Sequence, residues 1–476
     1  MNSKVVIDVW VADLTFPGYM DRLRRLGEEF DAAHPEYHVN IRGCDFRTLP
    51  LEISEAAAQG CPPAIAECYF YITQAARDIR RADGTPLFTS VEKAIGGRKE
   101  ILGEPVVIDD IIPAVRDYYT YDGDLTSMPS VATTMLLYAN ANLLRAAGVS
   151  DMPRNWDEVE AACKTVAELA DGPSHGITWS NHGLFFQQAL AVQGGLLVDN
   201  ANGRSGRAES VDLVSKEMLA WVTWWRRLHQ DGHYLYTGKI PDWEGTFKAF
   251  ATQEVAFRIT SSNDLNYMVQ AAESGGFDIE VSRFPDNGRV PYAGNALAGT
   301  SLWLADGLDE VTRDGALAFL QYMHNPHNAA DQHKSNSFVP VTNASFDLLE
   351  KEGWFDRHPY HRVASDQLKT YPAHRAAEEQ VDAATTTPQS WGALFGDFAG
   401  VQDVMTRAMG DVLSHGADPV ARFAEATAEA QQLLDDYRAE CLRTGPRSPN
   451  SLRVEFFRDA EPYSGADLEN VVQLNR

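Results

Sequence analysis

The sequence has few basic residues for its length, and it has no apolar run long enough to cross a membrane. Its 476 residues include 41 Lys and Arg against 67 Asp and Glu, which gives a formal net charge of −26. Nucleic acids and anionic membrane surfaces attract clustered Lys and Arg, so we expect neither as a partner. An anionic small molecule is not excluded, because it senses only the local field of its pocket.

Cysteine is scarce too. The five cysteines are odd in number and scattered: Cys44, Cys61, Cys68, Cys163 and Cys441. This spacing does not indicate a disulfide framework, and Cys61 and Cys68 lack a second pair to complete a zinc site. We therefore expect free thiols, no metal site and no cofactor. The strand-like stretch VVIDVWVA begins soon after Met1. We expect an extracytoplasmic protein if a leader has been removed, and a cytoplasmic one if Met1 is the native start.

Several signatures of catalysis are missing. The sequence contains no GxGxxG after a strand, no GxxxxGK[ST] and no HExxH. Its Ser, His and Asp residues are too numerous and scattered to assign a triad, so we assign no catalytic residue. Catalytic groups often converge from distant segments, which keeps an enzyme open as an alternative.

The length of the chain favours two or more lobes. The first part alternates between strands and helices, with expected strands at residues 5–11, 37–41 and 64–69 and helices at residues 20–30 and 51–59. This order predicts a mostly parallel sheet covered by helices on both faces. From Trp156 onward the pattern is rich in helices, the last two at residues 398–414 and 419–441. The Gly- and Pro-containing stretch after Arg443 predicts an irregular tail.

Aromatic residues gather at or near the ends of the expected strands and in loops. They are Trp10, Phe16, Phe46, Tyr69, Phe70, Tyr71, Trp179, Phe185, Trp243, Phe338, Trp391 and Phe395. Ligands of open α/β sheets bind beyond the carboxyl ends of the strands. Aromatic faces at such points suit the C–H faces of a sugar or polyol. Their joint placement favours a binding site, although any one of them is more often part of a core.

Three short polar clusters also adjoin expected strands. They are Thr133-Thr134, Ser261-Ser262-Asn263 and Gly299-Thr300-Ser301. Hydroxyls and free backbone N–H groups there could bind ligand oxygens without a buried charge, or simply cap the strand ends. The third cluster, in AGTSLWLADGLDE, could cradle an anion, hold a nucleophile or enter a strand.

Several stretches together resemble a known family. They are PEYHVNI, PAIAECY, MPSVATTMLLYANANLLRAAGV, NWDEVEAA, FATQEVAFRITSSNDL and the long segment from Gly299 to Pro359 that contains NPHNAA and FVPVTN. In order, they cover roughly residues 5–440 and resemble the extracellular solute-binding proteins, family 1, of ABC importers. Within that family they are most similar to the group that contains the glycerol-3-phosphate- and maltose-binding proteins.

The resemblance implies a periplasmic-binding-protein type II-like α/β fold, with two lobes, a hinge of crossing strands and a ligand cleft between the lobes. We expect crossings near residues 128–135, 295–302 and 338–342. The first lobe would then comprise residues 1–131 and 297–340, and the second residues 132–296 and 341–442. Residues 443–476 would form the tail. The lobes would close on the ligand like a hinge.

The resemblance also implies site residues. The family's cleft tyrosine falls on Tyr69, a second aromatic near Phe46 and a hydroxyl residue on Ala132 or Thr133. A serine pair falls on Ser261-Ser262, a glycine on Gly299 and a further cleft aromatic on Phe338. Three positions depart from the pattern: an acidic residue is Phe70, a tryptophan aligns near Asn181 with Trp179 close by, and a phosphate-pairing arginine falls near Leu394. Losing that arginine disfavours glycerol 3-phosphate itself, although His182 or Arg258 could replace the cation.

The full set of candidate ligand-binding residues is Trp10, Asp13, Phe46, Tyr69, Phe70, Thr133, Trp179, Asn181, His182, Ser261, Ser262, Asn263, Gly299, Thr300, Phe338, Trp391 and Phe395. We expect a monomer that binds a sugar, polyol or glycerophosphodiester without chemistry and delivers it to ABC permease subunits. The alternative is a cytoplasmic protein that keeps the fold as an enzyme or ligand sensor. A structural or adaptor role fits less well, because the chain is rich in charge.

Overall fold

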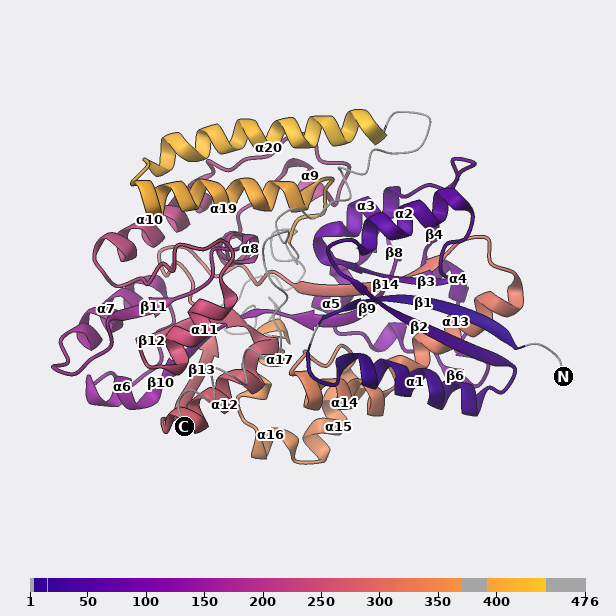
Figure 1. The fold of residues 1–476 in the computed structure, drawn as a ribbon, viewed down its shortest axis with the longest axis horizontal. Helices are drawn as coiled ribbons and strands as arrows, with labels where there is room; N and C mark the ends of the chain where they lie inside the picture. Colours follow the sequence, from indigo (N-terminus) through magenta and orange to yellow (C-terminus); the bar gives the residue numbers. More distant parts are fainter. Residues whose placement is uncertain (1–3, 15, 370–391, 442–476) are drawn as a thin grey trace.

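The computed structural model describes residues 4–14, 16–369 and 392–441, which form two α/β lobes side by side (Figure 1). The sheet of the first lobe has the order β2-β1-β3-β14-β4, with β9 also paired to β14. Its strands are β1 (Val5–Asp13), β2 (Tyr37–Asp45), β3 (Ile65–Tyr69), β4 (Phe88–Thr89), β9 (Met128–Thr133) and β14 (Ala298–Ala305). β1 to β3 are parallel, but β14 is antiparallel to β3, β4 and β9. The sheet is mostly parallel, as expected, because all of its strands except β14 run in one direction, whereas β14 enters from the other lobe and runs against them.

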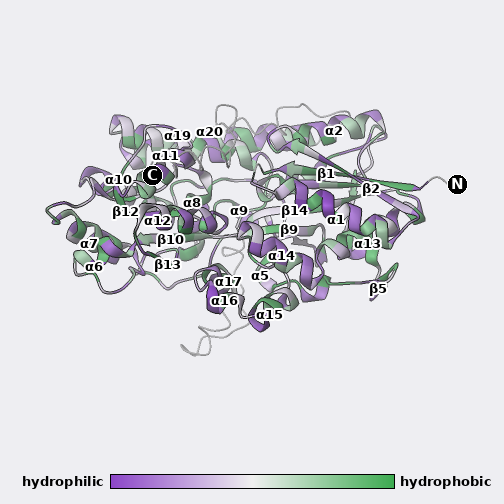
Figure 2. Cartoon of the chain, turned by 60° about the horizontal axis from the view of Figure 1, so that its bottom comes forward, coloured by the Kyte–Doolittle hydropathy of each residue, from purple (hydrophilic) through white to green (hydrophobic). Residues whose placement is uncertain are grey.

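Helices cover both faces of this sheet (Figures 1 and 2). α1 (Tyr19–Ala33) and α13 (Glu310–Met323) lie on one face, and α2 (Leu49–Gln59) and α3 (Thr73–Asp78) on the other. α1 buries Leu23, Leu26 and Phe30, which recur at helical spacing. Shorter elements complete the lobe: α4 (Val91–Ile95), α5 (Pro113–Tyr118), β5 (Glu100–Ile101), β6 (Glu104–Pro105), β7 (Thr120–Tyr121) and β8 (Asp124–Leu125), with 3₁₀ turns at Phe70–Ile72 and Ile108–Asp110.

The second lobe has a four-stranded sheet of order β11-β12-β10-β13, in which only β11 and β12 are parallel. Its strands are β10 (Met135–Asn140), β11 (His175–Thr178), β12 (Val255–Ser261) and β13 (Ile279–Arg283). The helices are α6 (Ala141–Ala146), α7 (Trp156–Ala167), α8 (Gly183–Gln193), α9 (Asp199–Gly203), α10 (Lys216–Gln230), α11 (Trp243–Ala251), α12 (Leu265–Gly275), α19 (Phe398–His415) and α20 (Pro419–Cys441), with a 3₁₀ turn at Ser262–Asp264.

Indole rings fill the core of the second lobe. Trp224 lies between two others, with centroids 5.1 Å from Trp156 and 5.8 Å from Trp179 and interplanar angles of 14° and 9°. Trp221 and Trp225 of the same helix, α10, pack around this stack. All five rings are at most 3% exposed. The rings anchor α7 and α10 against the end of β11, and their burial is a large share of the lobe's apolar stabilisation.

Two crossings join the lobes through strands. Thr133 is the last residue of β9 in the first sheet and Met135 is the first residue of β10 in the second. The chain returns between Arg283, at the end of β13, and Ala298, at the start of β14. From the sequence, these crossings are expected near residues 128–135 and 295–302.

The third crossing comes later than expected. Residues 338–342 run along the first lobe, where the Val339 amide donates to Ala132 and the Ile112 amide donates to Val341. α14 (Pro326–Asn336), α15 (Asn343–Lys351) and α16 (Trp354–Arg357) follow that lobe, and the Ala344 amide donates to the Asp110 carboxylate. The chain reaches the second sheet through α17 (His361–Lys369), which packs against β13. Residues 370–391 and the expected tail at 443–476 lie outside the described residues.

Gln367 of α17 binds all three crossings. Its Nε2 donates to the Thr134 hydroxyl (2.6 Å) and to the Met135 carbonyl (2.9 Å). Its Oε1 accepts from the Phe284 amide (2.9 Å), and its backbone carbonyl accepts from the Asn295 side chain (3.2 Å). The side chain is 4% exposed. Gln367 therefore satisfies polar groups from separate segments at the points where the chain passes between the two sheets.

Two buried histidines mark the junction of α14, α17 and α12. His333 Nδ1 lies 2.7 Å from the Phe338 carbonyl and His361 Nε2 lies 2.8 Å from Asn266 Oδ1, so each of these nitrogens donates. The rings meet edge to face with centroids 5.7 Å apart. Burial lowers the pKa of His333 to about 4 and the pKa of His361 to about 3. Both imidazoles are therefore neutral at pH 7.

Replacing Gln367 with Ala should lower the free energy of unfolding by about 1–3 kcal/mol, because buried groups at the crossings lose their partners. Urea unfolding followed by circular dichroism measures the change. Gln432→Ala is the control, since Gln432 is exposed on α20 and its side chain donates to Asp436 one turn away. An equal loss in both variants would contradict the role of Gln367.

Acidification should destabilise the fold from about pH 6.5 downward. The pKa values of His333 and His361 are lower in the folded than in the unfolded state, so the unfolded state takes up protons first as the pH falls. Each histidine then costs up to about 1.4 kcal/mol per pH unit until its folded pKa is reached. Denaturant unfolding at pH 4.5–7.5 should show a shallower slope for His361→Gln than for the exposed-site control His327→Gln. Identical slopes would exclude this origin.

Candidate functional site

The carboxyl ends of the three parallel strands lie at one edge of the first sheet, next to the second lobe (Figure 1). Asp13 ends β1 in register with Asp45 at the end of β2. Phe46 follows β2, and its ring centroid lies 5.5 Å from that of Tyr69 at the end of β3. Phe46 and Tyr69 are both partly exposed. The structure thus brings Asp13, Phe46 and Tyr69 together, at the edge where open α/β sheets bind ligands.

The pairing of β3 with β14 and of β14 with β9 connects these strand ends to the first crossing. Tyr69 is in register with Thr300 of β14, and Ala298 is in register with Thr133 of β9. Gly299 lies between them at φ 139°, and a Cβ there would come within 2.0 Å of the Val131 carbonyl oxygen. Only glycine fits so close an approach of two strands. Thr133, Gly299 and Thr300 therefore adjoin Tyr69 at the base of the lobe junction.

A buried carboxyl group lies under this part of the sheet. Glu67 of β3 accepts from the Ala12 amide (2.9 Å) and from the Thr300 hydroxyl, and Ser130 is a further side-chain partner. Burial raises the pKa of Glu67, although its hydrogen bonds act in the opposite direction. Glu67 is 1% exposed, so it positions the strand ends rather than facing a ligand. This role was not predictable from the sequence, because a single acidic residue in an apolar strand forms no recognisable motif.

The serine pair continues the line in the second lobe. Ser261, at the end of β12, is in register with Met135. The Ser262 amide donates to the Thr134 carbonyl (2.8 Å), and the Ser262 hydroxyl accepts from the Thr134 amide (3.2 Å). Ser262 therefore holds the crossing, while the Ser261 hydroxyl donates to Asn263 Oδ1. Asn263 is the member of this cluster that is partly exposed, whereas Ser261 is buried, at 9% exposure.

Trp243 is a stronger aromatic candidate in this lobe than Trp179. Trp243 begins α11, is partly exposed, and its ring lies 5.1 Å from that of His182. Trp179 is 0% exposed within the indole stack, where a ligand has no access to its ring. The sequence shows both residues in the aromatic set but does not separate them, because proximity to a strand end does not reveal which ring faces the core.

His182 and Arg258 do not supply the cation that the resemblance leaves missing. His182 Nδ1 accepts from the Leu184 amide as the cap of α8, and burial lowers the pKa of His182 to about 3, so the ring is neutral. Arg258 is 0% exposed and pairs with Asp264 at 3.4 Å, while its second arm donates to the Trp243 carbonyl. Arg258 therefore anchors the start of α11 from behind.

Arg47, a further cation near the strand ends, is also paired with a carboxylate. Arg47 Nε donates to both carboxylate oxygens of Asp45, at 2.8 and 3.0 Å. This pairing lowers the pKa of Asp45. Because Asp13 and Asp45 are both carboxylates and Arg47 is paired with Asp45, these strand ends offer no excess of positive charge, which favours an uncharged or zwitterionic ligand over a simple anion.

The remaining predicted residues have other surroundings. Trp10 lies within β1 under the Arg42 guanidinium, 4.4 Å away, three residues before the strand end. Phe70 and Phe395 are buried and both pack on Phe398 of α19. Phe338 is buried and meets Phe16 at 5.8 Å. The Asn181 amide donates to the Thr406 carbonyl (2.8 Å). Trp391 lies outside the described residues.

Neither Ser301 nor Ser174 has the surroundings that a catalytic serine nucleophile requires. The Ser301 hydroxyl is buried and accepts from Ser127 at 2.8 Å. Residues 172–176 spell G-P-S-H-G, the letters of a nucleophile elbow, but that elbow needs a strand before the serine and a helix after it. Ser174 instead precedes β11, and its hydroxyl donates to the Glu254 carbonyl.

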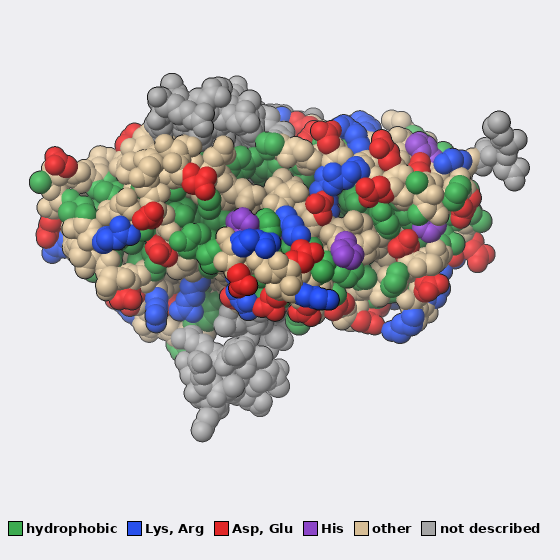
Figure 3. All heavy atoms as spheres, turned by 90° about the horizontal axis from the view of Figure 1, so that it is seen from below, with side chains coloured by type: hydrophobic (Ala, Val, Ile, Leu, Met, Phe, Trp, Pro, Cys, Tyr) green, Lys and Arg blue, Asp and Glu red, His purple; other side chains and the backbone are tan. Residues whose placement is uncertain are grey.

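The described residues contain no group of three or more His, Cys, Asp and Glu side chains arranged to hold a metal ion. Within the same ranges, no helix combines the length and the apolarity that crossing a membrane requires. On the face drawn in Figure 3, Lys and Arg alternate with Asp and Glu and do not gather into a basic patch.

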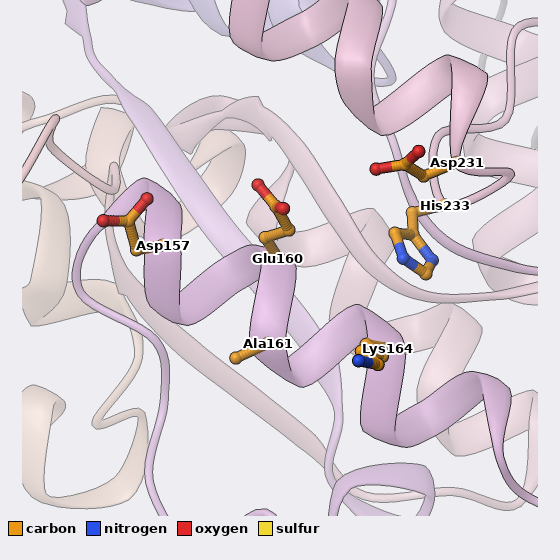
Figure 4. Close-up of a pocket in the computed structure, with 6 residues that line it drawn as sticks. All are labelled: Asp157, Glu160, Ala161, Lys164, Asp231 and His233. Carbon is orange, nitrogen blue, oxygen red and sulfur yellow. The ribbon is translucent and has the colours of Figure 1, made fainter.

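A hollow of about 510 Å³ lies on the outer side of the second lobe, between α7 and the turn after α10 (Figure 4). Its lining residues are Asp157, Glu160, Ala161, Lys164, Asp231 and His233. Glu160 pairs with Arg227 at 2.6 Å and Asp157 pairs with Arg289 at 2.9 Å. Both carboxylates are paired, Asp157 is exposed and Glu160 is partly exposed, so the hollow has the character of a solvated surface.

Comparison with known proteins gives relatives of one kind. The chain is 26% identical over 359 residues to the sn-glycerol-3-phosphate-binding periplasmic protein of Salmonella typhimurium, which covers 73% of this chain and 77% of that protein. It is 25% identical over 366 residues to the protein of the same name from Escherichia coli K12, with the same coverage.

Solved structures show the same two-lobed fold. The sugar-binding protein MalE of Xanthomonas citri superposes with a TM-score of 0.69 at 16% identity, covering 93% of this chain and 100% of that one. UgpB of Mycobacterium tuberculosis, solved with glycerophosphocholine, gives 0.66 at 19% identity, covering 92% and 100%. Residues 25–362 match the model of the bacterial extracellular solute-binding proteins. The chain belongs to this family of solute-binding proteins.

Proposed function

We propose that this protein binds a carbohydrate, a polyol or a glycerophosphodiester between its lobes and presents it to ABC permease subunits, without chemistry. The observation that carries the proposal is the line of residues from Phe46 and Tyr69, through Gly299, to Ser261 and Asn263 at the lobe junction. Aromatic faces there suit the C–H surface of a sugar or polyol, and hydroxyls and amides suit its oxygens. Relatives that bind glycerol 3-phosphate and sugars support the ligand class.

The charge balance narrows the proposed ligand. Arg47 and Arg258 are each paired with a carboxylate, and His182 is neutral. A phosphate monoester would have to compete with Asp45 for Arg47, whereas a neutral sugar or a zwitterionic diester such as glycerophosphocholine would not. We therefore place neutral and zwitterionic solutes ahead of glycerol 3-phosphate.

We also propose an extracytoplasmic monomer. The curated relatives are periplasmic, and the matching family is described as extracellular. The five cysteines are free, so the fold in the proposed extracytoplasmic location does not depend on a disulfide. Searching the gene upstream of Met1 for an export leader, and measuring the mass in solution by light scattering, tests both parts.

Isothermal titration of the full chain with maltose, glycerol, glycerophosphocholine and sn-glycerol 3-phosphate tests the function. Binding of a neutral or zwitterionic member, with each ligand recovered intact by mass spectrometry, is the expected result. Absence of binding across the panel, combined with a product formed from any member, would favour the enzyme alternative.

Truncating the aromatic candidates should weaken binding while the fold stays intact. Tyr69→Ala and Trp243→Ala should each reduce affinity for the panel ligand that binds by about 1–3 kcal/mol, if the rings stack on it. Tyr322→Ala on α13 is the matched control, since Tyr322 is partly exposed and bonds to Glu29 on the far side of the first lobe. Equal affinity in all three variants would mean that the ligand lies elsewhere.

A further inference from the structure

A strained loop of the second lobe reaches the first lobe outside the candidate site. We call residues 199–210 the arginine loop. Asn200, Ala201 and Asn202 all adopt left-handed backbone angles, with φ of 50°, 55° and 60°. Residues other than glycine seldom adopt three such angles in a row, and such strain persists only where the surroundings enforce it.

Hydrogen bonds enforce the shape of the arginine loop. Asn202 Oδ1 accepts from the Leu197 amide (2.8 Å), and the Leu394 amide donates to the Asn202 carbonyl (2.9 Å). The Asn200 side chain donates to the Arg207 carbonyl (2.7 Å). At Gly203, φ is 76° and a Cβ would collide with the Leu394 carbonyl. The loop is therefore held in one conformation, which fixes the direction of its two arginines.

Arg207 forms a two-armed ion pair with Asp78, the last residue of α3 in the first lobe. Arg207 Nη1 lies 2.9 Å from Asp78 Oδ2, and Nη2 contacts Oδ1. The Tyr437 hydroxyl of α20 donates to the same carboxylate at 2.8 Å, and so does the Gln74 side chain. Asp78 is 1% exposed. Separating the lobes here would break both of the contacts that Asp78 receives from the second lobe, with Arg207 and with Tyr437.

Arg204 makes a second bridge from the same loop. It donates to the carbonyls of Asp117 (3.3 Å) and Tyr118 (3.1 Å) at the end of α5, and its guanidinium lies 4.9 Å from the Tyr118 ring centroid. The Tyr118 hydroxyl in turn donates to the Ala393 carbonyl (3.2 Å) of the second lobe. Both arginines thus bind helices of the first lobe.

The lobes also touch on the opposite face of the first sheet. There, Phe16 after β1 lies 6.3 Å from Tyr267 of α12, centroid to centroid. Figure 1 places α3 and the end of α20 on one side of the junction, and α1 and α12 on the other. Contacts on both sides indicate that the lobes are drawn together in the arrangement seen here.

We propose that the arginine loop is a latch, in which Arg207 on Asp78 holds the lobes in their closed arrangement and so sets ligand affinity from outside the cleft. This proposal extends the proposed function, because it assumes that the ligand binds where the lobes close. A latch of this kind adds stability to the closed form before any ligand arrives. The ligand then spends less of its binding free energy on closing the lobes, so its affinity is higher.

Small-angle X-ray scattering of the full chain without ligand is the direct test. Arg207→Gln and Asp78→Asn should each increase the radius of gyration, and the double variant should increase it no more than either single one. Arg227→Gln is the matched control, since Arg227 is similarly exposed but pairs with Glu160 within the second lobe. Unchanged scattering in both single variants, with normal folding by circular dichroism, overturns the latch.

Ligand affinity provides a second, independent test of the latch. With glycerophosphocholine or maltose, whichever the titration panel shows to bind, Arg207→Gln should weaken affinity by about 5- to 150-fold. Arg207→Lys should recover part of the loss. Tighter binding in Arg207→Gln would mean that the pair favours the open form, which also overturns the proposal. If no panel ligand binds, the proposed function fails while the scattering result still decides the latch. If Asp78→Asn does not fold, the half-exposed Arg207 still provides the test.

Discussion

The structure depends on satisfying polar groups where the chain passes between two sheets. A residue in a crossing belongs to neither ladder, so its buried N–H and C=O groups need side-chain partners. Gln367 provides them for the Met135 carbonyl and the Phe284 amide, and the Ser262 hydroxyl provides one for the Thr134 amide. Gln188 supplies a second set: its Nε2 donates to Asn295 Oδ1 (2.7 Å), and its Oε1 accepts from the Ala296 amide (3.0 Å). These neutral amides hold the crossings together without placing a charge between the lobes.

Strongly periodic segments were predictable and short or irregular ones were not. The last helix has the expected bounds, residues 419–441, and β1 covers the apolar, β-branched run predicted at residues 5–11. The sequence analysis did not predict α12 or the helices α14 to α17. Of these, α14 and α17 bury the polar residues His333, His361 and Gln367, whose burial depends on distant partners. The direction of β14 was also missed, because strand polarity follows from topology and not from composition.

The candidate site was predictable at the level of strand ends rather than of side chains. Tyr69, Gly299 and Ser261 come together because backbone register joins them, and alternating strand patterns indicate where strands end. Which aromatic faces the core was not predictable, as Trp179 illustrates. The pairing of Arg258 with Asp264 and of Arg207 with Asp78 also depends on packing between elements, which local sequence does not encode.

The indole stack has a spectroscopic consequence. Half of the ten tryptophans, at positions 156, 179, 221, 224 and 225, lie within one core, where parallel rings 5–6 Å apart couple their excited states. Near-ultraviolet circular dichroism and emission from this chain are therefore dominated by the interior of the second lobe. A change in the spectrum reports the integrity of that interior, whereas a signal for lobe movement has to come from a ring outside it, such as that of Trp243.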